Sequence, residues 1–334
     1  MAGRDVRRLL GRALQQTPDM KRNQIQRAVV GAVAAGAQRV LLMRDVFRSA
    51  ESAIEGLRLH AEVALLDGPM ETHAGDTQYA ARALRDEGCG ALIVLGGDGT
   101  NRQVALAWPE APLIPLSTGT NNVFPEMLEA TSAGAAAGLV AAGAVHIDEV
   151  SQRCKLVEIE YSDAEMDLAL VDVAVLDGDH AGSLLAFDPT QLRDLVLTRA
   201  EPAAVGMSPI GGLLQPVGRN DPGGLAVRCT APGAGGTPLL VPISPGIYRT
   251  AYVAEAAKLA EGVWTRVIGP GVLATDGDRT RTLAAGEAAR VRVVRHGPRV
   301  IDVPRSLALA AERGVFRERP AWHDAADTGG FDCC

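Results

Sequence analysis

The sequence predicts a chain of two parts, an α/β domain built on a parallel sheet and then a mostly antiparallel β domain. The length of 334 residues exceeds that of one typical domain, which favours two domains that share a cleft. In the first half, apolar strand-like runs alternate with segments of helical spacing, a rhythm typical of a parallel sheet with helices on its faces. After about residue 148 the apolar period changes to two, and glycine and proline interrupt many short runs.

The first half alternates helices and strands in order along the chain. Apolar residues at helical spacing, with stops at Gly36, Gly88 and Gly143, predict helices over residues 6–14, 25–33, 50–57, 77–87, 101–108 and 126–142. Short apolar runs predict strands over residues 40–43, 62–66, 91–95 and 111–116. Because these strands alternate with helices, we expect them to lie parallel in one sheet.

The second half is almost entirely strand-like. Short β-type runs predict strands over residues 157–161, 168–176, 196–198, 225–229, 263–268, 271–275, 289–294 and 300–303. A short closing helix is predicted over residues 307–311, ahead of Gly314.

Composition and charge exclude several classes of protein. The formal charge of -7 and the pI near 5.5 argue against a nucleic-acid surface, which needs clustered Lys and Arg. No apolar run reaches the ~18 residues that a membrane span needs, and the start lacks the apolar core of a secretory signal, so we expect a cytoplasmic protein that binds no membrane. The five cysteines and six histidines show no metal-ligand spacing and no disulfide framework.

A glycine-rich loop carries the strongest chemical signal. The predicted strand 91–95 runs directly into Gly96, Gly97, Asp98, Gly99 and Thr100, and a predicted helix follows. Glycines allow a tight turn and close approach of the backbone to a phosphate, and the amides at a helix start favour an anion. A carboxylate beside phosphates needs a bridging cation or a proton to accept. The alternative is that Asp98 only caps the following helix.

A second polar loop follows the next predicted strand. Residues 117–122 run Ser-Thr-Gly-Thr-Asn-Asn after the strand 111–116. Loops at the carboxyl ends of neighbouring parallel strands line the ligand crevice of open α/β sheets. Taken alone, this loop is better explained as a polar cap for the next helix.

At these residues the chain resembles the superfamily of NAD kinases and diacylglycerol kinases, whose hallmark is a Gly-Gly-Asp-Gly-Thr loop. It is most similar to the acetoin catabolism protein X group, usually described as ATP-NAD kinase-like, in residues 3–9, 117–125, 197–202 and 211–214. The resemblance covers nearly the whole chain. It implies a Rossmann-like N-terminal domain followed by a β-sandwich domain.

The resemblance also implies a division of the chain and a role for each motif. The division is a nucleotide-phosphate-binding domain over 1–148, a β-sandwich over 149–298, a segment over 299–318 that returns to the first domain, and a tail over 319–334. Asp98 would organise Mg²⁺ or activate the acceptor hydroxyl. The nucleotide would contact Gly96, Gly97, Gly99, Thr100, Thr118, Gly119, Thr120, Asn121 and Asn122. Asp172, Ser208 and Asp276 would serve the acceptor, with Asp276 as a second Mg²⁺ ligand.

The acceptor patterns of the superfamily are incomplete in this chain. Asn122 stands where lipid kinases have Asp, and Val171 stands where NAD kinases have Asn. The run 207–212, which contains Ser208, offers fewer hydroxyls than the acceptor loop of NAD kinases. Asp276 and Gly277 also form a ready hairpin signal, so function and turn stay open for Asp276.

Three interpretations of the function remain. The first is an ATP-dependent phosphotransferase that uses Mg²⁺ and acts on NAD or a small hydroxylated metabolite. The second is a nucleotide-binding accessory or sensor protein without efficient turnover, and a scaffold with an empty crevice is a third interpretation. Since no apolar strand precedes the helix that starts near Asp5, we also predict that the sheet lacks a first strand, which favours a homodimer.

Overall fold

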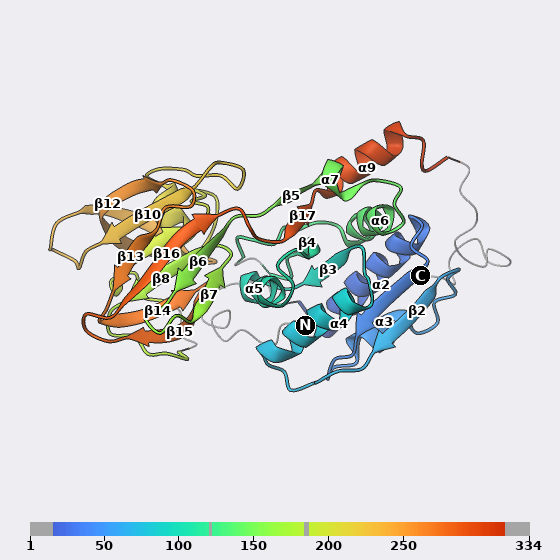
Figure 1. The fold of residues 1–334 in the computed structure, drawn as a ribbon, viewed down its shortest axis with the longest axis horizontal. Coiled ribbons are helices and arrows are strands. Elements are labelled where there is room, and N and C mark those ends of the chain that lie inside the picture. Colours follow the sequence, from blue (N-terminus) through green and yellow to red (C-terminus); the bar gives the residue numbers. More distant parts are fainter. Residues whose placement is uncertain (1–15, 120–121, 184–186, 318–334) are drawn as a thin grey trace.

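The computed structural model describes residues 16–119, 122–183 and 187–317 (Figure 1). Its helices are α2 Pro18–Ala34, α3 Ser49–Ile54, α4 Ala74–Asp86, α5 Asp98–Ala107, α6 Ala130–Ala141, α7 Ile147–Val150, α8 Ser208–Gly212 and α9 Val303–Glu312. The strands of the first half are β1 Arg39–Met43, β2 Glu62–Leu66, β3 Leu92–Leu95, β4 Pro112–Leu116 and β5 Ser151–Arg153. The helix predicted over 6–14 lies outside the described residues.

The strands of the second half are more numerous. They are β6 Leu156–Glu160, β7 Met166–Ala169, β8 Asp172–Leu176, β9 Leu192–Leu197, β10 Gly224–Cys229, β11 Thr237–Ser244, β12 Ile247–Leu259, β13 Thr265–Ile268, β14 Gly271–Thr275, β15 Asp278–Leu283, β16 Ala288–Val294 and β17 Arg299–Ile301. Apart from β17, which lies beside β4 and β5, the strands of this group that Figure 1 labels are gathered at one end of the molecule.

The N-terminal domain is Rossmann-like, as predicted. Strand β1 pairs in parallel with β2, and β3 pairs in parallel with β4 in a second sheet of order β3-β4-β17-β5. Apolar side chains pack α2 and α3 over one face of these strands and α4 and α5 over the other. The helix α4 ends at Gly88, whose φ of 74° suits the left-handed turn after a helix.

The helices α2 and α6 pack so closely that glycine is required at their contact. A Cβ atom on Gly134 would lie 2.1 Å from the carbonyl oxygen of Ala28, and one on Gly138 would lie 2.2 Å from that of Ala32. The low aromatic content of the chain is consistent with this packing, because small side chains let helix backbones approach.

The C-terminal domain is a β-sandwich of two antiparallel sheets. The larger sheet has the order β11-β12-β10-β9-β8-β14-β15, and the smaller has the order β13-β16-β6-β7. Their inner faces share one apolar core, which includes Ile159, Val173, Val196 and Val291. Along each strand, every second side chain therefore points into this core, and the side chains between them point to the outer face of the sheet.

Two expectations about the second half of the chain were wrong, and one hairpin there was not predicted. The single strand predicted over 168–176 is two strands in different sheets, because the amides of Leu170 and Val171 leave the ladders and donate to the carboxylate of Asp276. The strand predicted over 300–303 ends at Ile301, since Asp302 caps α9 by accepting from the amide of Arg305. The hairpin of β11 and β12 was not predicted.

Two features connect the domains. Strand β17 returns from the sandwich and lies between β4 and β5, as Figure 1 shows by its place beside them. Arg102 of α5 forms a largely buried ion pair with Asp167 of β7, whose side chain is 16% exposed, with nitrogen to oxygen distances of 2.6 and 2.7 Å. Arg102 also donates to the carbonyl of Leu168. None of the helices in the described ranges is long and apolar enough to cross a bilayer.

Candidate functional site

The glycine-rich loop joins β3 to α5 at the carboxyl end of the strands. Gly97 is the N-terminal cap of α5, and no side chain closes this helix end by a hydrogen bond. A Cβ atom on Gly96 would lie 2.7 Å from the Cβ of Thr100, so the turn requires glycine there. The loop therefore brings the first amides of α5 to a surface where an anion would be stabilised.

Asn101 holds this loop in shape from inside the protein. Its side chain is fully buried, and its Nδ2 donates to the carbonyl oxygen of Gly97 at 2.8 Å. This tie fixes the turn at the start of α5, so the loop is positioned before any ligand arrives.

Asp98 connects the two polar loops and does not cap its own helix. Its carboxylate accepts hydrogen bonds from the amides of Val123, at 3.1 and 3.2 Å, and of Phe124, at 2.8 Å. Asp98 is itself the first residue of α5, one position after the cap. The simple capping role considered for Asp98 is therefore wrong, and its charge serves the junction of the loops after β3 and β4.

Asp98 is a partly buried acid with a strongly shifted pKa. Burial raises its pKa to about 7, and the negative charge of Asp276 adds to the rise. The amides of Phe124 and Val123 and the charge of Arg199 act in the opposite direction. Such a carboxylate exchanges its proton near neutral pH, the range in which a general base is most effective.

Asp276 combines the two roles that the sequence left open. It forms the turn between β14 and β15 with φ of 48°, and Gly277 follows with φ of 82°, the pair of positive angles of a type I′ hairpin. Its buried carboxylate also accepts from the amides of Leu170, Val171 and Asp172 at 2.8, 2.7 and 3.2 Å. Burial raises the pKa of Asp276 despite these three donors.

The second polar loop is held together by its own side chains. Ser117 Oγ donates to the carbonyl of Gly119 at 2.6 Å and accepts from Asn122 Nδ2 at 2.8 Å, while Thr118 is buried. Thr120 and Asn121, predicted to contact the nucleotide, lie outside the described residues.

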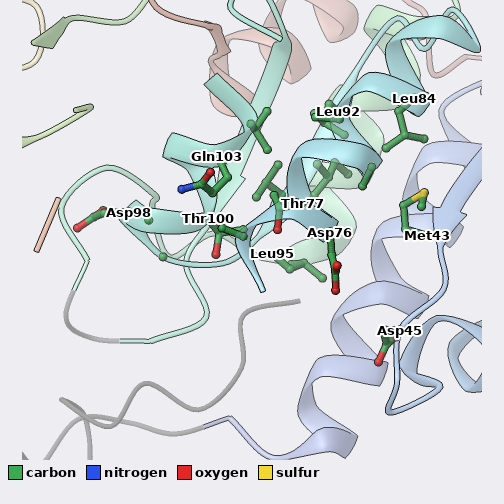
Figure 2. A pocket seen from close by; sticks show the side chains of 18 of the residues that line it. Met43, Asp45, Asp76, Thr77, Leu84, Leu92, Leu95, Asp98, Thr100 and Gln103 are labelled. Carbon is green, nitrogen blue, oxygen red and sulfur yellow. The ribbon is translucent and has the colours of Figure 1, made fainter. Parts of the chain in front are cut away.

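A cavity of about 1080 Å³ opens beside both loops. Seven of the predicted site residues line it: Gly97, Asp98, Gly99, Thr100, Asn122, Asp172 and Asp276. Figure 2 shows Asp98 at one end of the labelled side chains and the apolar Met43 and Leu84 at the other. The cavity thus has a polar end beside the two loops and a second part inside the N-terminal domain, where Asp45 and Asp76 line it together with apolar side chains.

Asp172 and Ser208 differ in their relation to this cavity. Asp172 begins β8 and lines the cavity wall. Ser208 is fully buried; its hydroxyl donates to the carbonyl of Arg199 at 3.0 Å and accepts from the amide of Glu201 at 2.9 Å. Ser208 is not among the residues that line the cavity, and its hydrogen bonds fix the 199–201 segment.

Buried arginines at the site were not predicted. Arg199 lies over the ring of Phe124, 5.4 Å from its centre, and donates to the carbonyl of Val123 at 3.2 Å. It therefore supports the segment whose amides bind Asp98. The sequence did offer a signal for Arg199, because an arginine inside the apolar run 195–200 is expected to be buried, and a buried charge needs specific partners.

The acidic side chains at the cavity fit a cation. Asp276 is buried and Asp98 is partly buried, and each carries a raised pKa, which means that the nearby arginines do not offset the cost of desolvating these charges. Among the described residues, one group of three possible metal ligands lies within 4.8 Å of one another, and it consists of the largely exposed Glu71, His73 and Asp76. Asp98 and Asp276 do not belong to that group. Phosphate oxygens would have to complete the coordination of Mg²⁺.

Comparison with known proteins gives a consistent picture. Residues 27–145 match the ATP-NAD kinase N-terminal domain, and residues 155–296 match the acetoin catabolism protein X C-terminal domain. Acetoin catabolism protein X of Cupriavidus necator is 34% identical over 340 residues, which covers 96% of this chain and 92% of that protein.

One solved structure shares the fold at low identity. The crystal structure of yeast NADH kinase complexed with NADH has a TM-score of 0.50 and 14% identity, and it covers 89% of this chain and 85% of that chain. An NAD kinase from Archaeoglobus fulgidus in complex with ATP has a TM-score of 0.40 and 15% identity, covering 84% and 100%.

Proposed function

This chain belongs to the acetoin catabolism protein X family, and we propose that it is an ATP-dependent phosphotransferase of the NAD kinase-like type. The reaction would transfer the terminal phosphoryl group of ATP to a hydroxyl of NAD or of a small metabolite. The name of the relative links the chain to acetoin catabolism, so metabolites of that process belong among the candidate acceptors.

One observation carries the proposal: a partly buried carboxylate with pKa of about 7 lies at the start of a helix that presents its first amides to a cavity. The amides of the loop 96–100 would bind phosphate oxygens. Asp98 would accept the proton of the attacking hydroxyl. The hydroxyl oxygen would bond to the terminal phosphorus as the bond to the bridging oxygen breaks, and ADP would leave.

Mg²⁺ is the proposed cofactor, with Asp98 and Asp276 as the acidic residues that would hold it. When bound, the ion neutralises charge on the phosphate oxygens. The protein contributes position: Asn101 and Gly96 fix the phosphate loop, and Arg199 fixes the segment that holds Asp98.

A second candidate is a nucleotide-binding accessory or sensor protein without efficient turnover. The observation that favours it is that both oxygens of Asp98 and both of Asp276 already accept hydrogen bonds from backbone amides. Carboxylates bound in this way serve structure as well as chemistry. In this case the site would bind nucleotide phosphates but position no acceptor.

A screen of the purified protein separates the two. ATP and Mg²⁺ are offered with NAD, NADH, acetoin and a panel of hydroxylated metabolites, and ADP release is measured for each. The proposal predicts that ADP is released when one particular acceptor is present and not in its absence. Binding of ATP without release across the panel would favour the sensor. A protein that binds no nucleotide would show no thermal shift, whereas a ligand at ~100 times its dissociation constant stabilises by ~2.7 kcal/mol.

A further inference from the structure

The cavity beside the loop 96–100 carries more acidic than basic side chains. Among the described residues that line it are six aspartates, which include Asp98 and Asp276, but only three arginines and no lysine. Each of these arginines is already in an ion pair with a carboxylate: Arg39, Arg44 and Arg279. A phosphate or carboxylate on the acceptor would therefore meet no unpaired arginine or lysine in this part of the structure.

Arg279 is fully committed to the turn that holds Asp276. Its side chain is 2% exposed, and its Nε donates to Asp179 Oδ2 at 3.0 Å. Its Nη1 donates to the carbonyl of Gly277 at 3.2 Å. Its Nη2 has no partner among the described residues, but it is sealed from solvent, so an anion in the cavity does not reach it. Arg279 therefore stabilises the fold of the site and is not available to an anionic ligand.

The sandwich side of the cavity is apolar. Phe187, Met207 and Ile243 line it there, and the last two are only 6% and 8% exposed. All three side chains pack in one apolar cluster on the large sheet, which holds them in place. This wall suits a ligand with an aliphatic body, because apolar surface that leaves water is stabilising.

A side pocket of about 360 Å³ extends this apolar wall. It shares Phe187, Ile243 and Ser244 with the main cavity, and Pro189 and Ile247 add two further apolar side chains. Its two charged residues, at positions 188 and 249, are exposed and of opposite sign. The side pocket therefore adds apolar surface to the site without a net charge.

Ser244 places a buried hydroxyl where the two spaces meet. It is the last residue of β11 and is 3% exposed. Its hydroxyl makes no hydrogen bond to a described residue, and it is not among the atoms that are sealed from solvent, so it is open to the cavity. Buried polar groups are normally hydrogen-bonded, which makes this hydroxyl a partner for a polar group of a ligand. Ser208, in contrast, spends its hydroxyl on the 199–201 segment.

We propose that the acceptor is an uncharged alcohol with an aliphatic body. The proposal rests on the phosphotransfer described above, and it decides between the two acceptors given there in favour of a small metabolite over NAD. The reacting hydroxyl would lie at Asp98, the aliphatic body on Met207 and Ile243, and a second polar group at Ser244. An anionic acceptor is disfavoured because like charges in one site repel each other.

The test uses two probes of equal shape that differ in charge, 6-hydroxyhexanamide and 6-hydroxyhexanoate, together with NAD. The full chain carries ¹³C in its methionine methyl groups, and Met207→Leu identifies the signal of Met207. Met166, which is 55% exposed on β7 and does not line the cavity, is the control signal. Titrations at pH 8 without nucleotide or Mg²⁺ expose each probe to the charges of the protein alone.

We expect the amide to shift the Met207 signal until it saturates and to leave Met166 unchanged. The acid should bind at least roughly tenfold more weakly, and NAD should not shift the Met207 signal. Ser244→Ala should weaken binding of the amide roughly threefold to tenfold, as expected for one lost hydrogen bond. Ser162→Ala, at an exposed position outside the cavity, is the matched control and should bind the amide like the parent.

Three results would overturn the proposal: no shift of Met207 with the amide, binding of the acid or NAD as tight as that of the amide, or unchanged binding by Ser244→Ala. ADP release with ATP and Mg²⁺ is measured separately for the same three compounds. An amide that binds at Met207 without ADP release would refute phosphotransfer and leave the ligand class standing. ADP release that depends on NAD would support phosphotransfer and overturn the uncharged acceptor.

Discussion

Replacing Asp98 by asparagine should remove a pH dependence of stability that the structure builds into the site. Burial and the charge of Asp276 raise the pKa of Asp98 to about 7 in the folded protein, from 3.8 in an exposed state. A raised acid pKa means that the folded state binds more protons than the unfolded state between these two values. The stabilising effect is fully present below about pH 4 and is lost as pH rises through 7.

The size of the effect follows from the shift. Three pK units correspond to ~4 kcal/mol, which is an upper value because part of it comes from coupling with Asp276. The asparagine side chain of the variant cannot titrate, but its amide nitrogen cannot accept the hydrogen bond of Val123, and this costs ~1–3 kcal/mol at every pH. We therefore expect Asp98→Asn to be less stable than the parent at pH 4.5 and equal or more stable at pH 8.

Urea unfolding of both proteins at pH 4.5, 6 and 8, without Mg²⁺, measures this difference. The stability of the parent minus that of Asp98→Asn should fall as pH rises. Asp19→Asn is the matched control, because the Asp19 side chain is 76% exposed at the start of α2, and its difference from the parent should stay nearly constant. A difference for Asp98→Asn that is flat, or that rises with pH, would refute the reasoning about burial.

Three further predictions concern the domain contact, the helix packing and the metal. Arg102→Met leaves Asp167 buried without its partner and should cost ~3–5 kcal/mol in urea unfolding, whereas the double variant with Asp167→Asn should lose less than the sum of the single variants; additive losses would contradict a direct pair. Gly134→Ala places a Cβ 2.1 Å from the Ala28 carbonyl oxygen and should cost ~1–3 kcal/mol by thermal or urea unfolding, and an unchanged midpoint would contradict the close helix contact. Mg²⁺ at pH 8 should raise the melting temperature of the parent more than that of Asp98→Asn, and equal shifts would place the ion elsewhere.

The parallel half of the fold was predictable because its signals are local. The run 91–95 and the glycine at position 88 mark a strand and a helix end by themselves, and the structure has β3 and α4 there. The hairpin of β11 and β12 has a turn signal at Pro245 and Gly246, but its strands are not marked in the same way. Strand β12 contains Ala, Glu and Lys, which are depleted in strands, and it is held in place by partners on both sides, β10 and β11.

The site was predictable only as far as its loops. The sequence indicated the loop 96–100 from its glycines and its place between a strand and a helix. It could not indicate that the amides of Val123 and Phe124 would bind Asp98, or that the turn at Asp276 would split the run 168–176 into two strands. These contacts join residues far apart in the chain, so tertiary structure alone brings them together.

The most direct test of the proposed phosphotransfer is the turnover of Asp98→Asn with an acceptor that the parent protein phosphorylates. Loss of a general base or metal ligand lowers the rate by ~10² to 10⁴. We expect the turnover to collapse by this factor at pH 7.5, while ATP without Mg²⁺ still binds and the melting temperature changes by a few degrees. Near-normal turnover in a clearly destabilised variant would contradict the account and leave Asp98 with a structural role, and Asp276 would become the residue to test.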